Sequence, residues 1–304
     1  MKVSVVIPAH NPRGDYLALV LDALRRQSLP AADWELVVVD NRSTEPLAAR
    51  LDLGWHPNAR VVREEMLGLT RARLAGFAAS KGEIIVLVDD DNVLGGDYLS
   101  RVLEVAQECP FLGVWGGSIA PRYEDPGLAP PNSLLPLLTV RVTAEDLWSN
   151  DPSHHASTPW GAGFCLRRSV ALRYARELEE QPQRAALDLQ GKRLLYSGDT
   201  DIAYTACRMG LGKAVMARLT LEHLIPKQRC SAEYLCRVAE GRGYTEVLHD
   251  YVLHGQMPDG RRSVASSIRA AVRRLRHTRL ENKVMTAHDA GRTAAMRDLV
   301  RTKA

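Results

Sequence analysis

Three consecutive aspartates, Asp89, Asp90 and Asp91, directly follow the apolar run IIVLV. Adjacent carboxylates repel one another unless a cation neutralises them. Residues i and i+2 project the same way from an extended chain, so Asp89 and Asp91 can act together while Asp90 points elsewhere. Mg²⁺ and Mn²⁺ prefer oxygen ligands, and Mg²⁺ is usually held by one or two carboxylates together with substrate phosphates. The segment therefore predicts a divalent metal site, with a solvated turn that caps the next helix as the alternative.

Cationic and imidazole side chains in two other segments suit a phosphate ligand. Arg71 and Arg73 lie near a predicted helix start in GLTRARLAG, and a guanidinium can pair with phosphate oxygens through two donors. In LTLEHLIPKQR, His223 follows a predicted strand and can complete a metal shell, while Lys227 and Arg229 can hold a diphosphate. An exposed helix face for the first pair, and a structural or exposed histidine for the second segment, are the alternatives.

Two further aspartates, Asp40 and Asp199, lie at the ends of predicted elements. Asp40 ends the run VVVD, where its carboxylate can accept hydrogen bonds from a ribose or nucleobase, or from the backbone of its own turn. Asp199 stands beside Gly198 at a predicted helix start, with Asp201 in the first turn. A general base and a helix N-cap are both open for Asp199, because aspartate is a favoured capping residue.

The segment PWGAGFCLRRS contains a tryptophan and two glycines in close succession. Gly161 and Gly163 indicate a close approach of the backbone to a ligand or to another segment. Trp160 can stack on the face of a sugar or pack in the core. His154 and His155 stand in the polar loop just before it, where solvated side chains are the simpler interpretation.

Alternating apolar runs and helical periodicities define the elements that must position these residues. Continuous Val/Ile runs are typical of strands buried on both faces, and their alternation with helices predicts a parallel sheet covered on both sides. In the first part of the chain the expected strands are Val3–Pro8, Trp34–Val39, a short one near Val61, and Ile84–Val88, and the expected helices are 15–27, Leu69–Ser80 and Tyr98–Cys109.

The pattern changes beyond residue 111. A Pro-rich polar stretch, Pro121–Ser157, fits no regular element, and a second polar stretch covers 181–193. Around them, strands are expected at Phe111–Ile119, Gly163–Arg168 and Ala214–Glu222, and helices at 169–180, 199–210, Tyr234–Tyr244 and Glu246–Leu253.

Composition excludes several classes of protein. The 304 residues are 45% hydrophobic and 25% charged, which is typical of a globular chain and excludes chain-wide disorder. The wholly apolar runs are far shorter than the roughly 20 residues that a spanning helix needs. The N-terminal apolar run stops at Pro8, too early for a secretory signal. The five cysteines form no CxxC pair, which favours reduced thiols and a cytosolic protein.

The basic character of the chain belongs to its last part. Residues 261–304 contain 12 Lys or Arg against 3 acidic residues, so the rest of the chain is acidic overall. Within it, 264–284 has the spacing of a rough amphipathic helix, which could lie on an anionic membrane surface. A helix packed on the main domain, or a partly disordered tail, is the alternative. Nucleic-acid binding is not expected, because no aromatic residues are interleaved with the arginines.

The motifs IPAHN, VVVDN, GLTRARLAG, VDDDN, GAGFCLRR, GDTDI and HLIPKQR, in this order, resemble family 2 glycosyltransferases of the GT-A fold. The resemblance covers about 1–245 and is strongest to bacterial members that build surface polysaccharides. It implies an α/β fold with a mixed, mainly parallel sheet and helices on both faces. A nucleotide-binding half would occupy about 1–110 and an acceptor half 111–245, followed by a basic helical C-terminal extension over 246–304.

The same resemblance implies a role for each motif residue. The implied base is Asp199, and the implied metal ligands are Asp91, Asp89 and His223, of which Asp91 would bind the metal directly. The implied nucleotide-sugar contacts are Pro8, His10, Asn11, Asp40, Arg73, Asp89, Asp90, Gly163 and Arg229, and the implied acceptor contacts are Trp160 and Asp201. Family members usually carry Glu-Asp where this chain has Gly198-Asp199, and often Asn where Leu74 stands.

These roles imply a metal-dependent, inverting glycosyltransferase that uses Mg²⁺ or Mn²⁺. The donor would be a nucleotide-diphospho-sugar, and the acceptor a hydroxyl of a saccharide or a lipid-linked molecule. A domain that holds nucleotide-sugar without turnover is the alternative, supported by the missing Glu before Asp199. A sugar nucleotidylyltransferase is disfavoured because no Gly-rich phosphate loop follows the first strand. We expect a cytoplasmic location, peripheral to the inner face of the membrane if the tail binds lipid.

Overall fold

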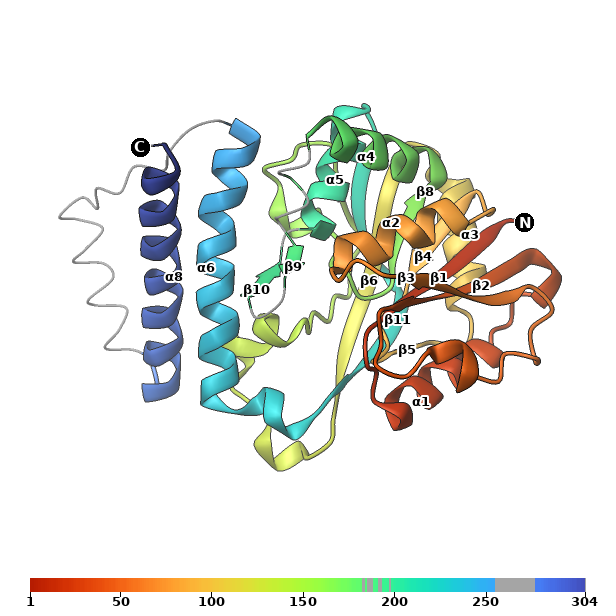
Figure 1. Cartoon of the computed structure of the whole chain (residues 1–304), viewed down its shortest axis with the longest axis horizontal. Coiled ribbons are helices and arrows are strands. Elements are labelled where there is room, and N and C mark those ends of the chain that lie inside the picture. Colours follow the sequence, from red (N-terminus) through yellow and green to blue (C-terminus); the bar gives the residue numbers. More distant parts are fainter. Residues whose placement is uncertain (182–183, 185–187, 191–192, 197, 255–276, 304) are drawn as a thin grey trace.

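The computed structural model describes residues 1–181, 184, 188–190, 193–196, 198–254 and 277–303. Within this part of the chain, a nine-stranded mixed sheet forms the centre of the molecule in the order β3-β2-β1-β4-β8-β6-β11-β5, and β7 pairs with β11 (Figure 1). The strands are β1 (Val3–Ala9), β2 (Trp34–Asn41), β3 (Ala59–Glu64), β4 (Ile84–Leu87), β5 (Asn92–Leu94), β6 (Leu112–Tyr123), β7 (Leu147–Ser149), β8 (Phe164–Arg167) and β11 (Gly212–Ile225). A separate two-stranded sheet pairs β9 (Asp188–Gln190) with β10 (Arg193–Tyr196).

The strand directions bring the motif residues to one edge of the sheet. Strands β1 to β4 run parallel, and β6 runs parallel to β11. Between these two groups, β8 is antiparallel to both β4 and β6. Because Ala9 at the end of β1 is in register with Asp40, the loops after β1 and β2 meet at the same edge as the aspartates after β4. The expected strands of the first part, and the mainly parallel sheet, are confirmed.

Helices cover both faces of this sheet, as the alternation of buried strands predicts. Helices α1 (Gly14–Arg25) and α3 (Tyr98–Glu108) pack on one face, in the cluster that contains Val5 and Ile7. Side chains alternate along a strand, so Val6 faces the opposite cluster. That cluster is covered by α2 (Leu69–Ala79), α4 (Arg168–Glu180) and α5 (Gly198–Arg208).

The segment that sequence patterns leave unplaced folds mainly into short 3₁₀ helices. Strand β6 extends to Tyr123, and the chain then forms η3 (Pro126–Leu128), η4 (Asn132–Leu138), β7 and η5 (His155–Ser157). Helix η4 contributes Leu134 and Leu138 to a third hydrophobic cluster. Its last residue is followed by Thr139 in the left-handed region (φ 54°), which is unusual for a β-branched side chain.

The C-terminal part forms a pair of long helices beside the sheet (Figure 1). Residues Ala232–His254 form the single helix α6, so the expectation of two helices that meet near Thr245 is wrong. The Thr245 hydroxyl donates to the Gly241 carbonyl oxygen, which satisfies this polar side chain within the helix. Helix α6 also runs through the expected domain boundary between 245 and 246, which stays a prediction.

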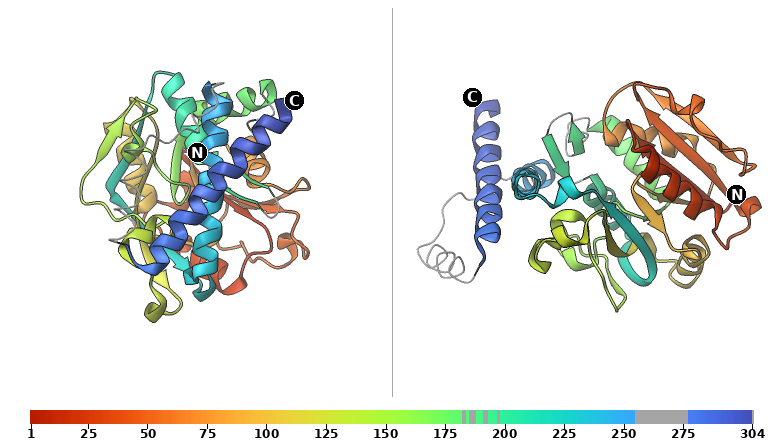
Figure 2. Two further views of the ribbon diagram at one scale, coloured as in Figure 1. Left: turned by 90° about the vertical axis from the view of Figure 1, so that its left-hand side faces the viewer. Right: turned by 90° about the horizontal axis from the view of Figure 1, so that it is seen from below.

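Helix α8 (Arg279–Lys303) crosses the outer side of α6 (Figure 2). The two backbones approach closely at a pair of glycines. A Cβ added to Gly243 would lie 2.1 Å from the His288 carbonyl oxygen, and one added to Gly291 would lie 1.9 Å from that of Glu240. The crossing therefore requires glycine at both positions.

The predicted amphipathic helix 264–284 lies largely outside the described residues. Among those that are described, α8 packs Val284 into the third hydrophobic cluster, next to Leu235 and Ala239 of α6. No helix in the described part of the chain has the length and apolar character needed to cross a bilayer.

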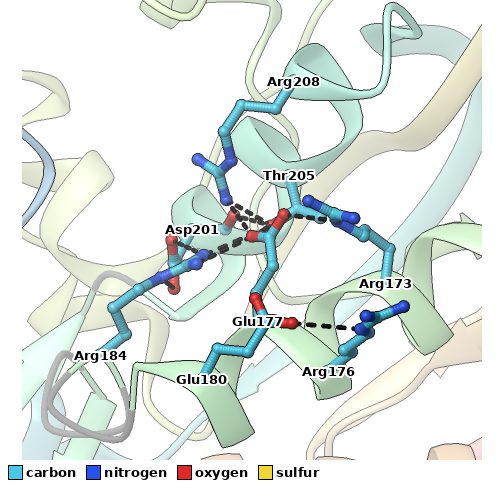
Figure 3. Close-up of polar contacts among 8 residues, drawn as sticks. All are labelled: Arg173, Arg176, Glu177, Glu180, Arg184, Asp201, Thr205 and Arg208. Carbon is cyan, nitrogen blue, oxygen red and sulfur yellow. Dashed lines mark hydrogen bonds and ion pairs between the residues drawn. The ribbon is translucent and has the colours of Figure 1, made fainter.

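A buried cluster of charges ties α4 to α5 (Figure 3). Glu177 of α4 accepts hydrogen bonds from the guanidiniums of Arg184 (2.8 Å), Arg208 (2.6 Å) and Arg173 (2.8 Å). Arg184 also pairs with the fully buried Asp201 of α5 at 2.6 Å. Burial opposes ionisation of Glu177, but the hydrogen bonds from the three arginines outweigh it and hold its pKa at about 2.

We expect Glu177→Gln to lower the free energy of unfolding at pH 7 by about 2–3 kcal/mol, since it leaves the buried Arg184 without one of its anions. A carboxylate whose folded pKa is depressed stabilises the fold above its usual pKa of 4.5, and this contribution is lost as the pH falls towards 2. Chemical denaturation at pH 7 and pH 3 should therefore show a smaller difference between wild type and variant at pH 3.

Glu180→Gln is the matched control. Glu180 lies on the same helix, but its partner Arg176 is exposed, and such pairs contribute only about 0.5 kcal/mol. Equal effects of the two substitutions at pH 7 would contradict a special role for the buried cluster.

Candidate active site

A cleft of about 730 Å³ opens at the edge of the sheet where the motif residues meet. Residues at the carboxyl ends of β1 and β4 contribute to its lining, and so do residues of α6 and α8. Of the residues singled out in the sequence, it is lined by Pro8, Arg73, Asp89, Asp90, Asp91, His155, Trp160, Gly161, Asp199, His223 and Arg229. Asp91 and Asp199 therefore share one cavity, although they are distant in the sequence.

Asp91 lies among three polar side chains of the cleft. Its Oδ2 atom lies 2.9 Å from Nη1 of Arg229 and 3.4 Å from Nε2 of His223, and Oδ1 accepts from the Asn92 amide at 3.0 Å. Burial disfavours the charged form, but the Arg229 guanidinium favours it and contributes to the lowered pKa of Asp91. Asp91 is thus a buried anion that is held ionised by its neighbours.

The pKa values of the other two aspartates of the triplet are raised instead. Burial, together with the nearby charge of Asp91, raises the pKa of Asp89. For Asp90, burial and its two aspartate neighbours raise the pKa to about 7. Without an added cation, the three carboxylates therefore do not all stay charged at neutral pH. A divalent ion would reduce the repulsion between them and favour their charged forms.

His223 is oriented by the strained end of η4. Its Nδ1 lies 2.9 Å from the Leu138 carbonyl oxygen, which can only accept, so Nδ1 carries the proton. The Nε2 lone pair of a neutral imidazole then points towards Asp91 and accepts from Arg229 at 3.1 Å. Fixing one ring nitrogen by a backbone carbonyl is the usual way to orient a metal-binding histidine.

These donors would fit a divalent cation that takes its other ligands from phosphate and water. Within the described ranges, no three His, Cys, Asp or Glu side chains are arranged to hold a metal ion on their own. Mg²⁺ and Mn²⁺ sites that contain one or two protein ligands take their remaining ligands from phosphates and water. Asp91 and His223 would supply the protein ligands here, with Asp89 nearby.

Asp199 lies in the first turn of α5 and faces the segment that carries the two glycines. Its Oδ2 accepts from the Gly161 N–H at 2.8 Å, and Oδ1 accepts from the Thr200 N–H at 2.8 Å. These bonds fix the orientation of the carboxylate at the cleft wall. A Cβ at Gly161 would lie 3.1 Å from an Arg73 nitrogen, so glycine allows the buried Arg73 to lie close to this backbone.

Two cations support the wall around Trp160. The Arg141 guanidinium stacks 4.3 Å from the centre of the Trp160 ring and donates twice to the Thr158 carbonyl oxygen. The fully buried Lys213 donates to the carbonyl oxygen of His154 at 2.7 Å and to the Thr158 hydroxyl at 2.6 Å. These bonds hold the loop that brings His155 and Trp160 to the cleft.

Three residues expected at the nucleotide form a hydrogen-bonded rim outside the lining of this cleft. Asp40 is buried, and both its oxygens accept backbone N–H bonds, from Ser43 and from Leu47. Arg63 adds an ion pair to Asp40 at 2.7 Å. Asp40 therefore holds its own turn, the alternative that the sequence leaves open. His10 and Asn11 bond to the same loop, through the Asn41 carbonyl oxygen and the Ser43 hydroxyl.

Two further expectations need correction. Asp201 does not reach the cleft as an acceptor contact, because its carboxylate is fully buried against Arg184. Gly163 does not line it either. It adopts φ 66°, and its carbonyl oxygen accepts from the buried Tyr98 hydroxyl at 2.6 Å. A Cβ at Gly163 would lie 2.5 Å from both Tyr98 and Leu221, so this glycine serves packing behind the site.

The wall formed by α6 and α8 is the part of the site that sequence reasoning misses. It is lined by Arg242, Thr245, Glu246, His249, Asp250 and Arg292. These five residues of α6, which Tyr234 joins in the lining, are spaced i, i+3, i+4, i+7 and i+8, and this spacing places polar side chains on one face of a helix. This spacing is visible in the sequence. Arg292 of α8 bonds to Glu246 at 2.9 Å, so the C-terminal helix also reaches the cleft.

The family model for glycosyl transferase family 2 matches residues 4–171, more than half of the chain. The chain belongs to this family. Its first half and the glycine-containing segment up to α4 fall within the match, so the triplet of aspartates is part of the family domain.

Among curated proteins, a poly(ribitol-phosphate) beta-glucosyltransferase from Bacillus spizizenii is 32% identical over 112 residues, which is 36% of this chain and 18% of that protein. The chain spans less than half the length of each curated relative described by these matches.

Solved structures show the fold at low sequence identity. A mannosyltransferase from Pyrobaculum calidifontis in complex with GDP-Man and Mn²⁺ superimposes with a TM-score of 0.60 at 17% identity, covering 98% of this chain and 87% of that one. S. aureus TarS in complex with UDP-GlcNAc gives 0.52 at 13% identity, covering 99% and 92%. The mixed α/β architecture is thus the GT-A fold that the sequence predicts.

Proposed function

We propose that this family 2 protein is an enzyme that transfers a sugar from a nucleotide-diphospho-sugar to an acceptor hydroxyl. The observation that carries this proposal is the shared cleft: an ionised Asp91 stands on one side and an oriented Asp199 on another. Arg73 and Arg229 add cations to the same cavity, where they suit the diphosphate of a donor. Related structures that hold GDP-Man or UDP-GlcNAc support this class of donor.

The reaction divides between two groups of residues. Asp91 and His223 would hold Mg²⁺ or Mn²⁺, and the bound metal would neutralise charge that develops on the leaving diphosphate. Asp199 takes the proton of the acceptor hydroxyl as its oxygen attacks the anomeric carbon, and the bond to the donor phosphate breaks in the same displacement. A single displacement inverts the configuration at that carbon. Trp160 offers its ring as a surface for a sugar.

A saccharide or lipid-linked acceptor would bind against α6. The polar face that begins at Arg242 and ends at Asp250 lies across the cleft from the aspartate triplet, and hydroxyl-rich molecules are recognised by such convergent polar groups. The name of the B. spizizenii relative, a poly(ribitol-phosphate) beta-glucosyltransferase, is compatible with such an acceptor. Contact of residues 261–304 with an anionic membrane stays a prediction.

A thermal-shift screen against UDP-, GDP- and dTDP-sugars with Mn²⁺ tests the donor class. We expect one nucleotide class to raise the melting temperature by several degrees, since ligand at 100 times its Kd stabilises by about 2.7 kcal/mol. The same donor should release nucleoside diphosphate slowly in water and faster once an acceptor is added.

Two results would change the proposal. Stabilisation by a donor with neither hydrolysis nor transfer to any acceptor would favour the alternative, a nucleotide-sugar-binding domain without turnover. If no nucleotide-sugar stabilises the protein in the presence of Mn²⁺ or Mg²⁺, both functions are wrong.

A further inference from the structure

One nitrogen of Arg229 contacts both atoms that would hold a metal. Nη1 lies 2.9 Å from Oδ2 of Asp91 and 3.1 Å from Nε2 of His223, and these two acceptor atoms are 3.4 Å apart. Because Nδ1 of His223 is committed to the Leu138 carbonyl oxygen, Nε2 has a single lone pair, and Arg229 occupies it. The guanidinium thus places a positive charge at the point where these two atoms would bind a metal.

A divalent ion and the guanidinium cannot use these atoms together. A metal ion would lie about 2.1 Å from its oxygen and nitrogen ligands, in the space that Nη1 fills. The imidazole lone pair also cannot serve two partners. Metal binding therefore requires the Arg229 side chain to turn away, although its backbone N–H can stay bonded to the Pro226 carbonyl oxygen in η7 (Lys227–Cys230).

The cleft offers a new partner for the displaced side chain. The Arg229 side chain is 35% exposed and already lines the cavity, so it can turn without crossing the core. A diphosphate presents paired oxygens that suit the two-donor edge of a guanidinium. The Arg229 side chain therefore has an anionic partner before it moves, in Asp91, and after it moves, in the diphosphate of the donor.

We propose that Arg229 is a counter-ion switch: it neutralises Asp91 and caps His223 before the metal binds, and moves to the diphosphate of the donor afterwards. The step in which Arg229 binds the donor rests on the proposed function. The competition between Arg229 and the metal does not. By linkage, a donor that draws Arg229 away strengthens metal binding, and a metal that displaces Arg229 strengthens donor binding by the same factor.

Titration calorimetry with Mn²⁺ alone, without nucleotide, tests the competition. Arg229→Met removes the competing cation at nearly constant length, and we expect Mn²⁺ to bind about 10- to 100-fold more tightly, the worth of a charge-assisted hydrogen bond. Arg229→Lys keeps the charge but lacks the planar fork, so an intermediate affinity is expected. It also serves as the second variant if the methionine variant does not fold.

Lys227→Gln is the matched control, because it removes one positive charge from the same 3₁₀ helix. Its Mn²⁺ affinity should stay within about threefold of wild type, as expected for a screened charge. If Arg229→Met binds Mn²⁺ no more tightly than wild type, or no more tightly than Lys227→Gln, the switch is wrong.

The switch and the proposed function can fail separately. Unchanged Mn²⁺ affinity in Arg229→Met, with transferase activity present in the wild type, overturns the switch alone. Tighter Mn²⁺ binding in the variant, with no donor used by the wild type, supports the competition and overturns the transferase proposal.

Discussion

Asp199→Asn should lower the turnover number by about 10²- to 10⁴-fold while donor affinity stays nearly unchanged. A general base contributes a factor of this size, and the amide cannot take the proton of the acceptor hydroxyl. The side-chain oxygen of asparagine can still accept the Gly161 N–H, so the wall that carries Trp160 should keep its shape. Initial rates with saturating donor, together with donor titration, separate the two effects.

Asp250→Asn is the matched control for this substitution. Asp250 lines the same cleft from α6 and is exposed, so its amide variant should affect the Michaelis constant of the acceptor more than turnover. Turnover of Asp199→Asn close to that of wild type would remove Asp199 from the role of base.

Asp91→Ala should abolish metal-dependent donor binding, with a loss of at least about 100-fold, because the metal's charge stabilisation is worth several kcal/mol. Asp91 is the carboxylate of the triplet that stays ionised, and its removal deprives Arg229 of this ion-pair partner while the bond from Arg229 to His223 can remain. Calorimetry with donor and Mn²⁺, repeated with a chelator, measures the metal-dependent part.

Asp97→Ala controls for the loss of an acidic side chain. Asp97 stands a few residues further along, outside the cleft lining, where its half-exposed carboxylate pairs with Arg101 of α3. Donor binding should not change in this variant. If Asp91→Ala still binds the donor as tightly as wild type, in a manner that the chelator abolishes, the metal is held elsewhere.

The first half of the fold could be predicted because its information is local. Strands buried on both faces require unbroken apolar runs, and the runs before Asp40 and Asp89 contain them. The carboxyl ends of parallel strands meet at one edge, so polar residues at those ends identify the cleft. Asp89 to Asp91 are recognisable in the sequence for this reason.

Partners distant in the sequence determine where two of the predicted site residues lie. Asp201 stands two positions from Asp199 in the same motif, yet Arg184 draws its carboxylate into the buried cluster. Asp40 looks like a ligand contact, but Arg63 and the backbone of the following turn occupy it. No periodicity reports such pairings.

The segment around η4 could not be predicted because short 3₁₀ helices have no strong repeat. Its contribution to the site, the Leu138 carbonyl oxygen that orients His223, is a backbone atom next to a left-handed threonine. Side-chain patterns contain no information on that atom. The polar face of α6, in contrast, has a regular spacing that is recognisable in the sequence.

The helix crossing at Gly243 and Gly291 makes the wall formed by α6 and α8 rigid. Because the backbones of α6 and α8 touch there, neither helix can slide along or rotate over the other without a steric clash. The two helices therefore move together as one rigid unit. Arg292 directly follows Gly291 and donates a hydrogen bond to Glu246 of α6. A displacement of α8 would therefore also move Arg292 and Glu246, which line the cleft.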